Sequence, residues 1–496
     1  MTIRRLLVGP RAGAVGLALL ATLGAPAVAS AHGLSATYQS PLPLTVYLVG
    51  AALTVALSFL FVLARDVRAA PSAPGRTVPV PTWIRAALRV VGLIAWAWIL
   101  AQGIVGGTSD GAVAPLFLWI YGWVGVALIS ALVFPVWEWL DPFATLHDMG
   151  AWALRRLGVE GWAITPLPAS LRLWPAAAGF LFFVWLELVA VPGVATLTVV
   201  LAGYTVLTLA LMAQFGRDEW RAYGDTFSVW FRTLNRLATI GVAPSEEPDA
   251  PPDLVDERHV VRRAFASGLI ESRWEVARVA IVATGTGSII FDGASQTVAF
   301  ATVFGAPAIG PKTVILLAFL AIIVFGALGV GRLVSFGAIG AGLLPISVGY
   351  LVAHYLTYLL VDGQRILIAV SDPLQQGQDL FGTAFFEPSP TFLPPGLVWT
   401  VQLAAVVGGH MLGAWAGHAR AQRELEAAAV ARESRDLRHR RIKSEAPPPR
   451  ADLRVREVPL AVMMVCLTTL TLWSLGQSIV QEKAPESAVP SVTRPA

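Results

Sequence analysis

The chain has 496 residues, of which 55% are hydrophobic and only 14% are charged, and its mean hydropathy is +0.65. Soluble globular proteins carry roughly 25% charged residues, so this composition excludes an ordinary soluble enzyme. The net charge is +4, but so apolar a chain is not expected to bind nucleic acid. The single cysteine, Cys466, excludes a disulfide framework and a cluster of thiolate metal ligands.

Residues 1–31 predict a cleaved signal peptide. Three arginines near the start precede an apolar run, and Ala29-Ser30-Ala31 supplies the small residues that signal peptidase requires. Cleavage after Ala31 would leave His32 as the mature N-terminus, on the extracytoplasmic side. The alternative is an uncleaved first helix.

Ten apolar stretches of membrane-spanning length follow the signal peptide. They predict an all-α fold, namely a polytopic transmembrane helix bundle in contact with the lipid bilayer. The sixth stretch is the weakest, because hydroxyl side chains dilute it. The stretches cover residues 43–63, 87–106, 115–135, 173–191, 194–214, 275–291, 311–331, 335–361, 397–417 and 459–479.

Arginines gather in alternate connections between these spans, which the positive-inside rule assigns to the cytoplasm. We therefore expect a multi-pass protein of a bacterial plasma membrane whose mature N-terminus is extracytoplasmic. The expected order is a bundle of nine spans (32–417) with an outer loop (365–396), a basic cytoplasmic segment (418–458), a last transmembrane helix (459–479) and an extracytoplasmic tail (480–496).

Two of the cytoplasmic connections contain more than a linker. Residues 143–157 and 217–237 mix aromatic side chains with arginines, which is typical of helices that lie on the membrane surface. By contrast, residues 244–256 are acidic and rich in proline, and this composition predicts disorder.

Ionisable residues inside the membrane are costly and therefore mark candidate functional positions. The eighth span carries Tyr350, His354, Tyr358 and Asp362 at four-residue intervals, so they are expected to form one ridge on the helix. The ninth span carries His410 among glycines at small-xxx-small spacing, which predicts close approach of a neighbouring helix. Glu187 and Asp292 are expected near the same outer face. The candidate catalytic residues are therefore His354, Asp292, Asp362, Glu187 and Tyr358.

Imidazoles and carboxylates are also the ligands of a divalent metal, which could activate a bound water. The candidate metal ligands are His354, Asp292, Asp362, His410 and His32, and the expected metal is zinc or copper. A mature N-terminal His32 would offer an amine and an imidazole nitrogen, a chelate suited to copper. The same groups also suit a proton relay, or simple hydrogen bonds between helices.

Several short motifs are distributed along the chain. They are Ala31-His32-Gly33, Trp137 with Asp141-Pro142-Phe143, Phe291-Asp292-Gly293, Ser371-Asp372-Pro373, residues 379–383 (DLFGT) and Gly409-His410. On these motifs the chain resembles the fenitrothion hydrolase-like polytopic membrane proteins of actinobacteria, over residues 31–480. The resemblance implies a membrane protein that hydrolyses an organophosphorus triester.

Two functional interpretations remain open. In the first, a metal at the polar cluster activates water against an apolar small-molecule ester that partitions from the bilayer. In the second, the same groups relay protons or ions in a transporter, whose polar groups should continue towards the cytoplasmic face. A third interpretation is a structural subunit that binds a membrane partner subunit.

Overall fold

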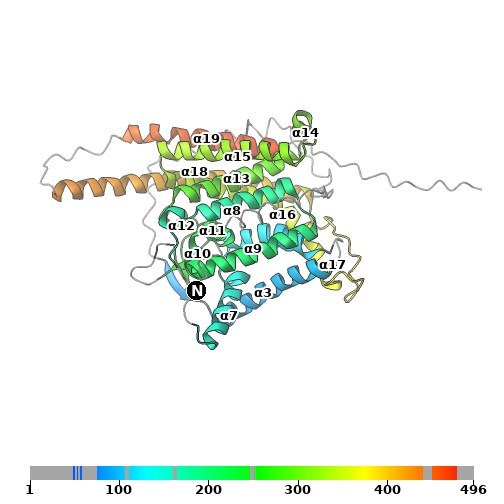
Figure 1. Cartoon of the computed structure of the whole chain (residues 1–496). Helices are drawn as coiled ribbons and strands as arrows, with labels where there is room; N and C mark the ends of the chain where they lie inside the picture. The colour runs from blue at the N-terminus through cyan, green and yellow to red at the C-terminus, as the bar shows by residue number, and fades with distance from the viewer. Residues whose placement is uncertain are drawn as a thin grey trace, which may run out of the picture.

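The computed structural model describes residues 75–106, 111–159, 165–245, 251, 253–438 and 450–476, with isolated positions between 49 and 57. The expected signal peptide, His32, most of the first expected span and the expected tail lie outside the described residues. The described chain forms a bundle of long helices that run side by side (Figure 1).

Eight segments of the described chain are long and apolar enough to cross a membrane. Their outward side chains include Ile322 and Phe325, which are 72% and 71% exposed. Lipid can cover such side chains. The protein is therefore a helical membrane protein in contact with the bilayer. The segments are α3 (Thr82–Val105); α4, η2 and α5 (Val113–Pro115, Leu116–Val126, Ala127–Leu132); η3, α8 and η4 (Ala169–Leu171, Trp174–Trp185, Leu186–Ala190); α9 (Val194–Phe215); α13 (Val276–Ser295); α15 (Ile309–Leu333); α16, η5 and α17 (Phe336–Val361, Asp362–Arg365, Ile366–Ser371); and most of α18 (Pro395–Arg438).

Each of these segments overlaps a span expected from the sequence. The last expected span corresponds to α19 (Arg450–Gly476), whose apolar part, Val458–Ser474, is shorter than the others. The span expected to be weakest is α13, and nearly all of its residues are buried. Its hydroxyl side chains face other helices instead of lipid, which explains the low hydropathy.

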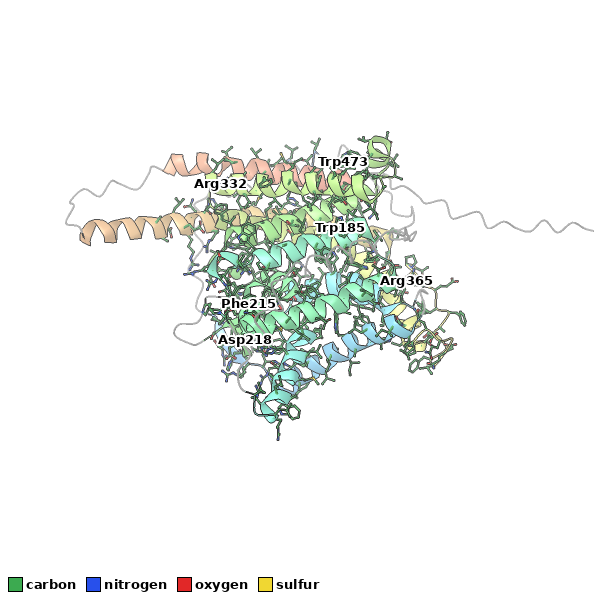
Figure 2. The ribbon with its side chains drawn as sticks, in the orientation of Figure 1. Trp185, Phe215, Asp218, Arg332, Arg365 and Trp473 are labelled. Atoms are coloured by element: carbon green, nitrogen blue, oxygen red, sulfur yellow. The ribbon has the colours of Figure 1, made fainter. Side chains whose placement is uncertain are left out.

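The bundle has two chemically different ends. Trp185, Arg365 and Trp473 mark one end, and Phe215, Asp218 and Arg332 mark the other (Figure 2). α13 runs from the second end to the first, where it carries Asp292. We call these the Asp292 end and the Arg221 end.

α16 and α18 pack closely because glycines remove the side chains between them. A Cβ atom on Gly413 would lie 2.4 Å from the carbonyl oxygen of Gly342, and one on Gly409 would lie 2.7 Å from that of Pro345. A Cβ atom on Gly417 would lie 3.1 Å from the carbonyl oxygen of Ala338. The close helix approach predicted from the small-xxx-small spacing is confirmed.

A small antiparallel sheet, which the sequence analysis did not predict, lies at the Arg221 end. Its strand order is β1-β3-β2, with β1 at Arg76–Pro79, β2 at Ile240–Pro244 and β3 at Val255–Arg262. β2 and β3 flank the segment that was expected to be disordered. The short helices of the described chain are α6 (Trp137–Leu140), α7 (Pro142–Arg156), α10 (Arg217–Tyr223), α11 (Thr226–Asn235), α12 (Ser267–Glu271) and α14 (Val298–Phe304).

Helices α10 and α11 do not lie on the membrane surface as predicted. Trp230 and Phe231 of α11 are 1% and 2% exposed, and Tyr223 of α10 is fully buried. Trp230 stacks against Trp123 of η2 and contacts Phe180 of α8. The aromatic side chains therefore belong to the protein core, although the same pattern is typical of an interfacial helix.

Helices α18 and α19 extend beyond the rest of the bundle at the Arg221 end (Figure 1). The helix expected to end near residue 417 instead continues without interruption to Arg438. Much of the predicted basic segment is therefore helical and not a linker.

Candidate functional site

Asp292 lies in the last turns of α13 and is 6% exposed. Its Oδ2 accepts a hydrogen bond of 2.7 Å from the hydroxyl of Tyr355 and lies 3.0 Å from Nε2 of His354. Its Oδ1 accepts a hydrogen bond of 2.9 Å from Gln296. One nearly buried carboxylate thus contacts two groups that can carry a proton, and both come from α16.

α16 presents the ridge that the four-residue spacing predicts, but with one addition. Tyr350 donates a hydrogen bond of 3.3 Å to Ser474 of α19, and its ring centre lies 5.8 Å from that of His354. The ring of Tyr355 is closer, at 4.6 Å from that of His354. The sequence analysis missed Tyr355 because it considered one helix face only, and an adjacent residue points about 100° away.

Glu187 and Lys312 bring two further ionisable groups to this cluster. Glu187 lies in the π-helix η4, and both its carboxylate and the Lys312 ammonium are close enough to Asp292 to interact electrostatically. π-Helical turns are rare and are found frequently at functional sites.

Two of the predicted residues lie apart from the cluster. The Oδ1 atom of Asp362 in η5 is 3.4 Å from Nε of Arg365. The side chain of His410 is buried in α18, where its Nδ1 is 2.8 Å from the carbonyl oxygen of Val406. Both of these partners lie within four residues of the side chain in the sequence. Tyr358 is partly buried on the ridge.

A metal-binding set does not form in the part of the chain that the structure describes. No three His, Cys, Asp or Glu side chains come together there in a way that could hold an ion. Asp292 and His354 supply one carboxylate and one imidazole, and they contact each other directly. A zinc or copper site needs three or four such ligands, so these residues do not fit the expected metal.

Polar side chains continue from Asp292 along α13 towards the Arg221 end. The hydroxyls of Thr286 and Ser347 lie 2.5 Å apart in the buried contact between α13 and α16. With a rise of about 1.5 Å per residue, Thr286 is about 9 Å along the axis from Asp292. Arg278, in the first turn of α13, pairs at 3.2 Å with Asp253.

A buried ion-pair network occupies the Arg221 end. Arg221 is fully buried and its guanidinium contacts the carboxylates of Asp141 (2.8 Å), Glu138 (3.2 Å) and Glu257. Glu138 also pairs with Arg232 at 2.6 Å. The pairs of Arg221 join α10 to α6, to the residue that precedes α7 and to β3. The pair of Glu138 with Arg232 joins α6 to α11.

The carboxylates of this network differ in proton affinity. Burial, together with the nearby Asp225, raises the pKa of Asp141 to about 6, although Arg221 opposes the change. Burial alone would raise the pKa of Asp148, but the nearby His147 side chain and the charges of Arg217 and Arg89 lower it to about 2. The pKa of Asp141 thus lies closer to neutral pH than that of Asp148.

Comparisons of the chain with protein-family models, with curated proteins and with solved structures found no significant match. The class of the protein is therefore defined by its fold and its site. It is a helical membrane protein with a nearly buried aspartate–histidine–tyrosine cluster near one end of the bundle.

Proposed function

We propose that the protein is a membrane transporter that moves protons across the bilayer, with Asp292 and His354 as its proton-binding site. The observation that carries this proposal is the direct contact between the two side chains, inside a helix bundle and 3.0 Å apart. Ionisable groups at such positions are costly, and they mark ion or proton pathways in membrane proteins.

The distribution of polar groups favours transport across the membrane over a reaction with a substrate that enters from one face. A site that reacts with a substrate from one face needs no polar groups in the other half of the bundle. Here the hydroxyl pair of Thr286 and Ser347 and the ion pair of Arg278 and Asp253 extend the polar residues towards the Arg221 end. On the arginine distribution we assign the Arg221 end to the cytoplasm of a bacterial cell and the Asp292 end to the outside.

In the proposed step, a proton from the aqueous phase at the Asp292 end binds the imidazole of His354. Histidine suits this task because a neutral imidazole has a ring nitrogen that can accept a proton and release it again. The imidazolium then faces the Asp292 carboxylate as an ion pair, while Tyr355 keeps its hydrogen bond to the same oxygen. Glu187 and Lys312 lie nearby, so two further ionisable groups border the proton-binding site.

The test is proton flux into vesicles that contain the purified full-length protein and an internal pH-sensitive dye. A potassium diffusion potential, set with valinomycin, drives protons inward. Vesicles with the wild type should acidify faster than protein-free vesicles, and Asp292→Asn or His354→Gln should abolish the difference. Asp362→Asn is the matched control, because that carboxylate lies near the same end and pairs with Arg365. Equal flux in wild-type and protein-free vesicles, or full flux in Asp292→Asn, contradicts the proposal.

A second candidate function is hydrolysis of an apolar organophosphorus ester, as the resemblance to fenitrothion hydrolase-like proteins implies. The observation in its favour is that Asp292 can orient His354, whose side chain is 15% exposed, as a general base. His354 would take a proton from water, the resulting hydroxide would attack phosphorus, and the ester oxygen would leave with its electron pair. Release of nitrophenol from a p-nitrophenyl phosphotriester, lost in His354→Gln, would support this function. No release above that of protein-free vesicles would exclude it.

A further inference from the structure

The loop between α17 and α18 exposes several large apolar side chains. Phe385 is 92% exposed, Phe381 70%, Leu380 59% and Phe392 56%. Exposed apolar clusters of this kind mark sites of interaction with protein or membrane. We propose that the loop formed by residues 373–394 inserts its phenylalanines into the bilayer at the Asp292 end, with lipid acyl chains as the partner.

The start of the loop lies beside the end of a membrane-spanning helix. The carbonyl oxygen of Pro373 accepts hydrogen bonds from Nε1 of Trp98 (2.7 Å) and Nε2 of Gln102 (3.1 Å), both on α3. These residues precede the end of α3 at Val105 by seven and three positions. The carbonyl group therefore lies against the last two turns of that helix.

The loop continues an exposed apolar surface of α3. α3 exposes Ile104 (79%) and Val105 (54%) at the same end, next to the residues that hold Pro373. The loop itself carries only two ionisable residues, Asp379 and Glu387. Asp379 accepts hydrogen bonds from Ser371 and from the backbone of Ala384, and its side chain is exposed, as is that of Glu387. A surface that combines large apolar side chains with a few polar groups suits the interfacial region, where aromatic residues are enriched.

Hydrogen bonds hold the loop in one conformation, so the phenylalanines are presented by a folded structure. Asp372 accepts bonds of 2.8 Å from the backbone nitrogens of Gln376 and Gly377. Thr383 donates a bond of 2.6 Å to the carbonyl oxygen of Leu367 on α17. Gln364 of η5 exchanges two bonds of 3.1 Å with the backbone of Ser389.

The experiment places an environment-sensitive fluorophore on the loop of the full-length protein. Cys466, the single cysteine, is replaced by alanine, and Phe385→Cys is labelled with a nitrobenzoxadiazole dye. Gln378→Cys is the matched control, because Gln378 is exposed on the same loop but next to Gly377 in its polar turn. The labelled proteins are reconstituted into phosphatidylethanolamine and phosphatidylglycerol vesicles, with or without brominated acyl chains.

We expect the dye at residue 385 to emit at shorter wavelength than the dye at residue 378, and to lose intensity in brominated vesicles. Aqueous iodide should quench the dye at residue 378 more strongly. Equal emission and equal iodide quenching at the two positions would overturn the proposal. Protection of residue 385 from both quenchers would also overturn it, because protein would then cover the patch. This inference does not depend on proton transport.

Discussion

The Nε2 atom of His354 lies 3.0 Å from Oδ2 of Asp292, and this contact joins α16 to α13 inside the bundle. Tyr355, the next residue of α16, donates a hydrogen bond to the same oxygen. Two adjacent residues of one helix therefore converge on a single carboxylate of another.

The first prediction concerns the Tyr355 hydroxyl. Tyr355→Phe removes a 2.7 Å hydrogen bond to Asp292 and leaves the packing of the ring unchanged. The free energy of unfolding should fall by about 1 kcal/mol, as for other single hydrogen bonds between membrane helices. Unfolding of the protein in mixed micelles measures the change. Tyr350→Phe is the control and should cost less, since its bond to Ser474 is 3.3 Å long. A larger loss for Tyr350→Phe would count against this ranking.

The second prediction concerns the buried network at the Arg221 end. Arg221→Met leaves the carboxylates of Glu138, Asp141 and Glu257 without their shared buried cation. Removing one partner of a buried ion pair costs about 3–5 kcal/mol, so this variant should be strongly destabilised or fail to fold.

The matched control for Arg221 is Arg258, whose side chain is 72% exposed and pairs with Asp256. Surface ion pairs contribute about 0–1 kcal/mol, so Arg258→Met should change the melting temperature little. Similar losses in the two variants would show that burial does not decide the effect.

The third prediction is a pH dependence of stability. The pKa of Asp141 is raised to about 6, above its value in an unfolded chain, mainly by burial and further by Asp225. The folded state then binds a proton that the unfolded state releases, so this contribution to stability falls as pH rises from about 4 to about 6 and levels off above. Asp141→Asn should remove that change.

Asp148 should act in the opposite sense. Its pKa is lowered to about 2 by His147, Arg217 and Arg89, which outweigh its burial. Its contribution is present above about pH 4 and is lost as pH falls towards 2. Melting temperatures of the wild type, Asp141→Asn and Asp148→Asn, measured from about pH 2 to about pH 6, separate the contributions of the two carboxylates. If the melting temperature of Asp141→Asn depends on pH in the same way as that of the wild type, Asp141 does not cause the fall in stability between about pH 4 and about pH 6.

The fourth prediction concerns the contact between α16 and α18. Gly413→Ala would place a Cβ atom 2.4 Å from the backbone oxygen of Gly342, so the helices must move apart. Overpacking of this kind typically costs about 1–3 kcal/mol. Gly408→Ala, on the same helix with no atom within 4 Å of its Cβ position, should cost nothing. Thermal unfolding of the two variants in detergent provides the comparison, and equal stability would contradict the packing argument.

The helices that face lipid were predictable from the sequence because lipid contact imposes one simple rule, a long apolar run. α15 follows this rule over Ile309–Leu333 and matches its expected span closely. The close contact of α18 with α16 was also predictable, since the glycine spacing has a direct steric meaning. The π-helices η2 and η4 were not predictable, because a change from i→i+4 to i→i+5 bonding leaves no mark on hydropathy.

The Arg221 end was predicted least well. The arginines and aromatic residues of α10 and α11 have the same pattern whether they lie on a membrane or inside a protein. Their burial depends on partners distant in the chain, such as Glu138 for Arg232 and Glu257 for Arg221. The contact of Asp292 with His354 and Tyr355 could not be predicted from the sequence for the same reason, because it depends on how α13 and α16 pack.

Proton uptake by the purified full-length protein tests the central claim most directly. The pH of an unbuffered detergent solution is lowered from 8 to 5, and a soluble indicator counts the protons bound by the wild type and by the double variant Asp292→Asn with His354→Gln. The wild type should bind about one proton more than the double variant, and that difference should be absent between the wild type and Asp362→Asn. Equal proton uptake by the wild type and the double variant would contradict the claim that Asp292 and His354 form the proton-binding site.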